Sequence, residues 1–365
     1  NNYNTAVGHE AGKLVTTGFQ NTLIGGLAGD ALTDADYNVA VGMQALTRDT
    51  LGSKSTAIGA GALDHQNFTS ATDSYNTAVG YGSGSAVTTG IQNTLIGGLA
   101  GDSLDVGSYN IAIGMNALTT DTKGSKSVAM GYDALGVQNF TSATDSFNTA
   151  IGHGAGRTIT TGIQNTLIGS LAGDALQDAD SNVAVGSNAL GVCVLGSRNT
   201  AIGIAALGNT NPSSAANMIN TAMGYAAGYN VTTGTNNLIL GNDSGRSGAP
   251  GGAITTGSNI ISLGDGNIAN AHIQVDWTVA SDARDKTDFT ALDLGLDFVK
   301  DLQPVTYKWD KRSKYGNKYA EDYDLNAQTP DGTHKEDWLD IGFKAQEVEA
   351  LEIAAGYNKS SKTNL

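Results

Sequence analysis

Short apolar runs recur at a regular spacing from residue 1 to residue 264. Each belongs to a five-residue phrase, Asn/Ser-x-apolar-apolar-Gly, as in residues 21–25. The phrase opens at the following positions: Asn4, Asn21, Asn38, Ser55, Asn76, Asn93, Asn110, Ser127, Asn148, Asn165, Asn182, Asn199, Asn220 and Asn237. A last, degraded copy ends at Gly264. Intervals of 17, 17, 17 and 21 between successive starts form a large repeat of 72, and such periods are typical of stacked repeat architectures.

The pattern inside one 17-residue unit predicts β-structure. Its apolar positions alternate with period two, and the unit is too short for a helix–turn–helix repeat. In the unit that begins at Asn21, we expect two extended runs, 22–24 and 27–32, joined by Gly and Asp turns. The fold class is therefore mainly β, with residues 1–264 forming a parallel β-roll or β-solenoid. About 15 coils at ~4.8 Å each would make a rod on the order of 70 Å long.

Three recurrent features predict how the rod is held together and what it presents. The repeated Asn suggests a stacked amide ladder, which Ser55 and Ser127 interrupt. The four additional residues of every fourth coil predict loops that protrude from one face, with Phe68 and Phe140 near their tips. A thin coil of Ala, Val, Ile and Leu leaves an apolar face exposed, so we expect lateral association.

A different pattern begins near residue 265. Residues 265–280 read as a connecting strand in which Ile273, Val275, Trp277 and Val279 alternate, and Trp277 could cover the end of the solenoid core. Residues 281–365 read as a small α+β module. It has a predicted helix over 293–301, ended by the following proline, a polar insertion or hairpin over 310–337, and a second helix beginning near residue 345.

Charge and composition narrow the possible partners. The net charge of -15 argues against nucleic acid or an anionic membrane, and no apolar run is long enough for a membrane span. Cys193 is the single cysteine, so a disulfide within the chain is excluded. Residues 25–30 resemble a glycine–aspartate calcium repeat but lack its nonapeptide period. We therefore predict no metal and no cofactor.

The repeated phrase resembles the head repeats of trimeric autotransporter adhesins, and still more the 17-residue repeats of phage tail-fibre proteins. The adhesin-head family is a trimeric, left-handed parallel β-roll whose usual repeat is shorter, so the 17- and 21-residue spacing here departs from it. The resemblance implies a homotrimer. Because Asn1 is already in phase with the repeat, we expect the natural chain to begin further upstream.

Three phrases in the second module carry another resemblance. They are Ser-Asp-Ala-Arg-Asp-Lys at 281–286, Leu-Gln-Pro-Val-Thr-Tyr-Lys-Trp at 302–309, and Ile-Gly-Phe-Lys-Ala-Gln-Glu-Val at 341–348. In this order they resemble the C-terminal intramolecular chaperone of phage tail spikes and fibres, the endosialidase-type auto-processing domain. Long C-terminal helices usually follow in that family, so we expect this domain to be truncated at residue 365.

The chaperone resemblance implies self-cleavage between Ala280 and Ser281. Ser281 would be the nucleophile and Lys286 the general base, which needs a lowered pKa to act near neutral pH. Arg284 and Asp282 would orient the pair or stabilise the oxyanion. An alternative is that the serine and aspartate at 281–282 only cap the start of the next element.

Three functions compete on these grounds. The first is a structural and host-adhesion protein: the distal part of a homotrimeric phage tail fibre, located in the virion, whose partners are other tail proteins and a host receptor, either a glycan or an outer-membrane protein. The second is a bacterial trimeric surface adhesin head, which would be expected to end in a membrane anchor. The third is a glycan-depolymerising tail spike, which would need stacking aromatics and paired acids that the regular coils do not provide.

Overall fold

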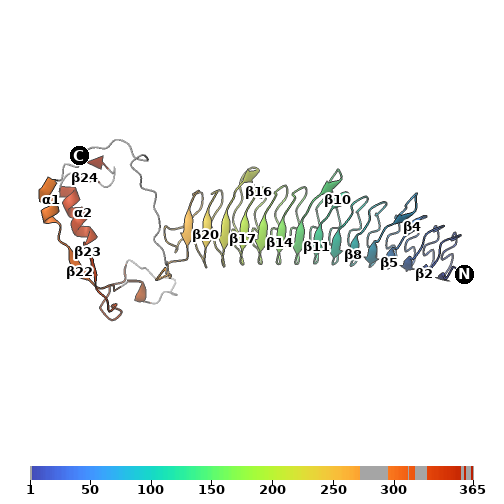
Figure 1. Cartoon of the computed structure of the whole chain (residues 1–365), viewed down its shortest axis with the longest axis horizontal. Helices are drawn as coiled ribbons and strands as arrows, with labels where there is room; N and C mark the ends of the chain where they lie inside the picture. The colour runs from blue at the N-terminus through green and yellow to red at the C-terminus, as the bar shows by residue number, and fades with distance from the viewer. Residues whose placement is uncertain are drawn as a thin grey trace. The chain divides into compact units, whose positions relative to one another are not determined.

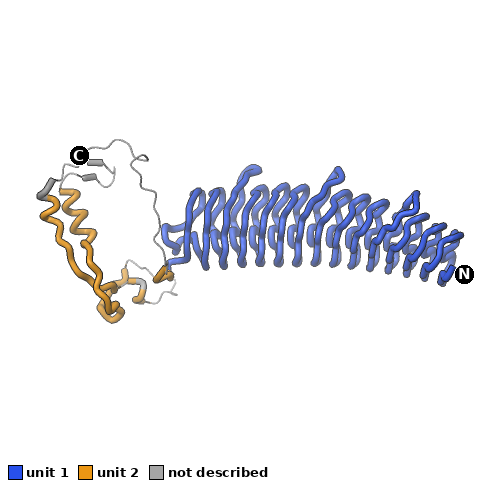
Figure 2. The backbone as a smooth tube through the Cα atoms, in the orientation of Figure 1, with its two compact units in different colours: residues 1–266 blue, residues 267–365 orange. Residues whose placement is uncertain are grey.

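The computed structural model describes residues 2–271, 295–310, 312–316, 327–354, 357–358 and 363–364. The chain divides into two compact units, Asn1–Gly266 and Asn267–Leu365, which are coloured separately in Figure 2.

The first unit is a parallel β-solenoid with a fifteen-stranded sheet along one side (Figure 1). Its strands are β1 (Thr5–Val7), β2 (Thr22–Ile24), β3 (Val39–Val41), β5 (Thr56–Ile58), β7 (Thr77–Val79), β8 (Thr94–Ile96), β9 (Ile111–Ile113), β11 (Val128–Met130), β13 (Thr149–Ile151), β14 (Thr166–Ile168), β15 (Val183–Val185), β17 (Thr200–Ile202), β19 (Thr221–Met223), β20 (Leu238–Leu240) and β21 (Ile261–Leu263). Each pairs in register with the strand of the next coil, for example Ala78 with Leu95. The predicted fold class is confirmed.

Period-two alternation places the core inside the coil. From β2 on, the middle residue of every strand in this sheet is buried, whereas the first and third residues point outward and are at least partly exposed. The buried column is made of Ala and Leu with one Ile and one Ser, and it packs against small apolar residues from the other side of each coil, such as Ala28 and Leu32. One continuous, narrow core therefore runs through the stacked coils.

The second apolar run of each coil forms turns instead of the predicted strand. In the coil of β2, Leu27 and Gly29 have positive φ, and the Leu32 N–H donates to the Gly29 carbonyl 3.3 Å away. The Gly29 N–H still bonds to the next coil, at Ala45 O. Tight turns shorten this side of the coil while keeping Ala28 and Leu32 in the core, which an extended run could not do.

An asparagine ladder runs along the corner that precedes the strands. The backbone N–H of Asn93 donates to Asn76 Oδ1 at 2.9 Å, and Asn93 Nδ2 donates to the carbonyl of Gly107 at 2.9 Å. The same pair of bonds joins most successive coils, and the asparagines involved are buried. The ladder satisfies polar groups that stacking removes from water, as the sequence predicts.

Two-stranded fins rise from the same side of the rod at three places (Figure 1). They pair β4 (Gly52–Ser53) with β6 (Thr72–Asp73), β10 (Gly124–Ser125) with β12 (Thr144–Asp145), and β16 (Gly196–Ser197) with β18 (Ala216–Asn217). The protruding loops are confirmed, but Phe68 and Phe140 are not at their tips. Both rings are buried at the loop base, because only there can they escape water.

The second unit contains short elements. They are α1 (Gly295–Asp301), β22 (Val305–Tyr307), the 3-10 turn η2 (Arg312–Lys314), β23 (Asp340–Gly342), α2 (Ala345–Ala354), β24 (Tyr357–Asn358) and β25 (Thr363–Asn364). β22 and β23 pair antiparallel, and so do β24 and β25. The predicted helices over 293–301 and from 345 are confirmed, with the first ending shortly before Pro304. The predicted strand over 265–280, including Trp277, falls largely outside the described residues.

Candidate functional site

The outer face of the fifteen-stranded sheet is the most uniform surface of the rod. Its third-position residues are all large and apolar: Val7, Ile24, Val41, Ile58, Val79, Ile96, Ile113, Met130, Ile151, Ile168, Val185, Ile202, Met223, Leu240 and Leu263. The first-position residues are Thr, Val, Ile or Leu. We call these two columns the strand face. It carries no charged residue in any of its strands, and most third-position side chains are more than a third exposed. An apolar stripe of this length is a candidate interaction surface.

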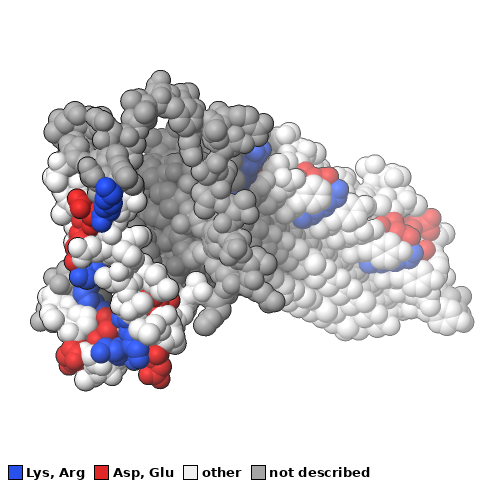
Figure 3. Space-filling model, turned by 60° about the vertical axis from the view of Figure 1, so that its left-hand side comes forward, with Lys and Arg blue, Asp and Glu red and all other residues white. Residues whose placement is uncertain are grey.

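Charge on the rod is confined to small groups elsewhere. In Figure 3, acidic and basic side chains on the visible face of the rod lie in mixed clusters separated by uncharged surface. Ion pairs join Lys54 with Asp73 and Lys126 with Asp145 at the first two fins, each at 2.6 Å. Both pairs are exposed to solvent, so each should contribute little to stability.

A buried carboxylate sits at the base of each of the first two fins. Asp121 Oδ1 accepts from the N–H groups of Gly124 and Phe140 at 2.9 and 3.3 Å, and Oδ2 accepts from Gln138 Nε2 at 2.6 Å. Gln138 in turn accepts from Asn148 Nδ2 at 2.8 Å, which joins the fin to the asparagine ladder. Burial raises the pKa of Asp121 more than these hydrogen bonds lower it.

The first fin contains the same arrangement, one large repeat earlier in the chain. Asp49 Oδ1 accepts from Gly52 and Phe68 N–H groups at 3.0 and 3.1 Å, and Gln66 Nε2 donates to Asp49 Oδ2 at 2.6 Å. Gln66 also donates to Ser55 Oγ at 2.8 Å. A serine at this ladder position has a smaller side chain than asparagine and therefore leaves room for the glutamine. Sequence reasoning missed this polar cluster, although its members recur together in the first two large repeats.

The third fin replaces the whole cluster. Cys193, Asn199, Thr210, Pro212 and Met218 occupy the positions that Asp121, Ser127, Gln138, Phe140 and Ser146 hold in the preceding large repeat. The ladder is continuous here, since the Asn220 N–H donates to Asn199 Oδ1 at 3.3 Å. Cys193 is buried, and this burial raises the pKa of its thiol to about 11, so it is an inert core side chain.

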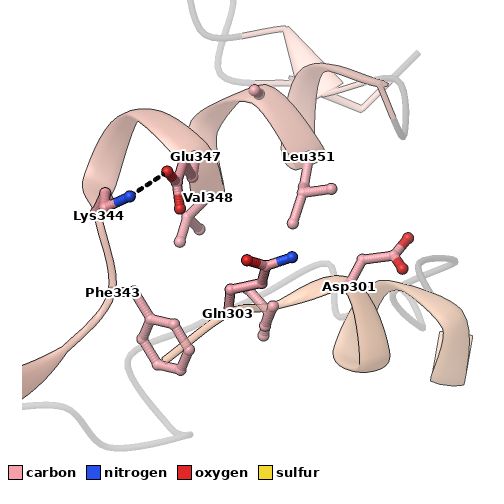
Figure 4. A pocket seen from close by; sticks show the side chains of 9 residues that line it. Asp301, Gln303, Phe343, Lys344, Glu347, Val348 and Leu351 are labelled. Carbon is pink, nitrogen blue, oxygen red and sulfur yellow. Dashed lines mark hydrogen bonds and ion pairs between the residues drawn. The ribbon is translucent and has the colours of Figure 1, made fainter. Parts of the chain in front are cut away.

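The second unit has a groove of about 410 Å³ beside α2. Figure 4 shows Phe343, Val348 and Leu351 facing Gln303 and the end of α1 across this space. Lys344 and Glu347 form an exposed ion pair of 2.7 Å at its margin. α2 has no buried residue, and Ile341 and Phe343 are exposed as well. This apolar surface is what a helix and strand present when further packing partners are needed.

The predicted processing residues cannot be placed. Ala280, Ser281, Asp282, Arg284 and Lys286 all lie outside the described residues. The nucleophile, base and cleavage site therefore stay predictions. Within the described ranges, no group of three or more His, Cys, Asp or Glu side chains is arranged to hold a metal ion. No described helix is long and apolar enough to cross a membrane.

Part of the second unit is similar to a known protein family. Residues 281–357 match the family model described as chaperone of endosialidase. No curated protein and no solved structure matches the chain. The matched segment includes β22, β23 and α2, and it begins at Ser281.

Proposed function

We propose that this chain is the distal part of a homotrimeric phage tail fibre that contributes to host attachment at the virion surface. The observation that carries the proposal is the family match at 281–357, directly after a regular β-solenoid. A long, regularly repeating shaft suits a structural and adhesive role, and the exposed strand face supplies a surface for association. The partners are two further copies, other tail proteins, and a host receptor.

The C-terminal unit is proposed to drive trimer assembly and then to cut itself off. Ser281 Oγ attacks the carbonyl carbon of Ala280 while Lys286 takes the hydroxyl proton. The bond from that carbon to the Ser281 nitrogen breaks, and the amine takes up a proton, leaving an ester. Water then hydrolyses the ester to a carboxylate on Ala280 and a free Ser281 hydroxyl. Arg284 and Asp282 support the reacting pair.

Intact and native mass spectrometry of the wild type beside Ser281→Ala tests both parts. We expect trimers of both proteins, with wild-type chains cut between Ala280 and Ser281 and variant chains intact. Uncut wild-type trimers would contradict self-cleavage and leave the fibre in place. Monomers of both proteins would contradict the trimeric fibre itself.

A further inference from the structure

The strand face has two long edges, and each is a column of single residues. The N-edge consists of the residue before each ladder position, such as Tyr75. The C-edge consists of the residue after each strand-closing glycine, such as Tyr81. Because the strands run across the rod and stack in register, the two columns lie along opposite sides of the face.

The two edges vary in phase along the rod. Aromatic N-edge residues share a coil with a large C-edge residue: Tyr3 with His9, Tyr37 with Met43, Tyr75 with Tyr81, Tyr109 with Met115, and Phe147 with His153. Each N-edge glutamine shares a coil with a glycine or serine at the C-edge: Gln20 with Gly26, Gln92 with Gly98, and Gln164 with Ser170. Basic N-edge residues accompany Ala60, Tyr132 and Ile204. Aromatic N-edge residues thus accompany large C-edge residues and glutamines accompany Gly or Ser, whereas basic residues accompany both small and large ones.

Contacts within one chain do not account for this relation. The two edge positions of a coil are six residue steps apart along mostly extended chain, which is about 20 Å at ~3.3 Å per step. The contacts that an edge makes within the chain run along the edge instead: the Lys54 ammonium lies 5.1 Å from the centre of the Tyr75 ring in the next coil. The side chains remain available, with Tyr75 50% and Tyr81 71% exposed.

We propose that the N-edge of one copy packs against the C-edge of a second copy, coil against equal coil, with the strand faces turned toward one another. The partner must present an apolar surface as long as the strand face and with the same repeat distance. A parallel copy of this chain satisfies both conditions. The proposal rests on the trimeric fibre proposed above, and it specifies the surface, the direction and the register.

Symmetry explains why unlike edges meet. Rotation about an axis along the rod, which generates a closed ring, brings the N-edge of each copy to the C-edge of its neighbour. Antiparallel rods would bring like edges together. The strand face itself is nearly uniform, so it does not oppose slippage. The edges oppose slippage, because a shift of one coil sets Tyr75 opposite Ala60 or Gly98. Large side chains then lie opposite positions that have little or no side chain to pack against.

Cysteine pairs at the edges test the proposal in the full chain. The same-coil pair is Tyr75→Cys with Tyr81→Cys, and the matched offset pair is Tyr75→Cys with Gly98→Cys. An added side chain at Gly98 meets no atom within 4 Å, so the offset variant should fold. Each pair and each single variant is oxidised mildly, or treated with a short bis-maleimide, and analysed without reduction. The buried Cys193 thiol, present in all of them, should stay unlinked.

We expect the same-coil pair to give covalently closed trimers at least about fivefold more efficiently than the offset pair, since disulfides need Cβ atoms within ~4 Å and one coil is ~4.8 Å. Single variants should give no linked product. Equal or better linkage of the offset pair would overturn the register, and linked single variants would overturn the parallel arrangement. Unlinked pairs in a protein whose native mass is trimeric would overturn the edge contact while leaving the proposed function intact.

Discussion

The rod and the second unit bury their apolar residues in different ways. In the rod, each coil from β2 on places its middle strand residue in a core completed by the next coil. In the second unit, α2 has no buried residue, and Ile341 on β23 is 81% exposed. Both regions have apolar sequence patterns, but only the rod finds enough neighbours within its own chain.

The difference lies in how neighbours are generated. Every coil of the rod has copies above and below that satisfy its backbone and its core, as in a one-dimensional stack. Among its described residues, the second unit offers two separate two-stranded pairs, each marginal by itself, and two short helices. The assembly role proposed for this region would supply the packing partners that these short elements lack among its described residues.

The largest effect should come from a side chain inserted between coils. Gly97 has φ of +134°, and a Cβ there would lie 2.5 Å from the carbonyl oxygen of Gly114. Gly97→Val should therefore lower the free energy of unfolding by more than about 4 kcal/mol, beyond the usual range for single substitutions. Denaturant unfolding at a fixed chain concentration measures it.

The adjacent Gly98→Val is the control for this substitution, because the Cβ it adds meets open space. It should change the free energy by about 1 kcal/mol or less. Similar losses for the two variants would contradict the view that backbone contact between coils limits the rod.

An intermediate effect is expected at the polar clusters under the fins. Asp121→Asn places an amide N–H₂, which is a donor, opposite the Gln138 amide that donates to the carboxylate. It should lower the free energy of unfolding by about 1–3 kcal/mol. Burial raises the pKa of Asp121 in the folded state. The stability that this carboxyl contributes is therefore fully present below its unfolded-state pKa of about 3.9, and it is lost as the pH rises through the folded-state pKa. The difference between wild type and Asp121→Asn should therefore be greatest in acid and narrow toward neutral pH.

The equivalent position of the third fin supplies the comparison. Cys193→Ala removes a neutral thiol whose pKa of about 11 lies far above the range tested. It should cost roughly 1 kcal/mol with no dependence on pH between about 4 and 8. Parallel pH profiles for the two variants would show that the carboxylate of Asp121 does not titrate as its burial requires.

The smallest effect on folding should be seen in the second unit. Ile341 is already exposed within the chain, so Ile341→Ser removes no core packing. The free energy of unfolding should therefore change by no more than about 0.5 kcal/mol. The same substitution should reduce the yield of trimer, measured by native mass spectrometry. A large loss of stability with unchanged trimer yield would contradict the view that Ile341 serves assembly and not the fold of its own chain.

Much of the rod could be predicted from the sequence because its repeats act locally. The phrase at residues 21–25 contains the ladder Asn, the strand and the closing glycine, and all three appear where expected. Burial of Phe68 and Phe140 could not be predicted, because it depends on Asp49 and Asp121 from the preceding coil. The run 27–32 looked extended, yet its turns are imposed by the need to close the coil.

The sequence by itself determined the stacked coils, their register and the asparagine ladder, because a strict period leaves each residue the same neighbours in every coil. It also predicted the resemblance of the second module to the endosialidase-type chaperone, and residues 281–357 match that family model. Only the tertiary structure decided which apolar residues remain outside. The sequence of an alternating strand does not say which of its two faces is buried. When the coil closes, the face that carries mostly Ala and Leu is the one that packs in the core. That choice leaves Val, Ile and Met on the strand face for a partner.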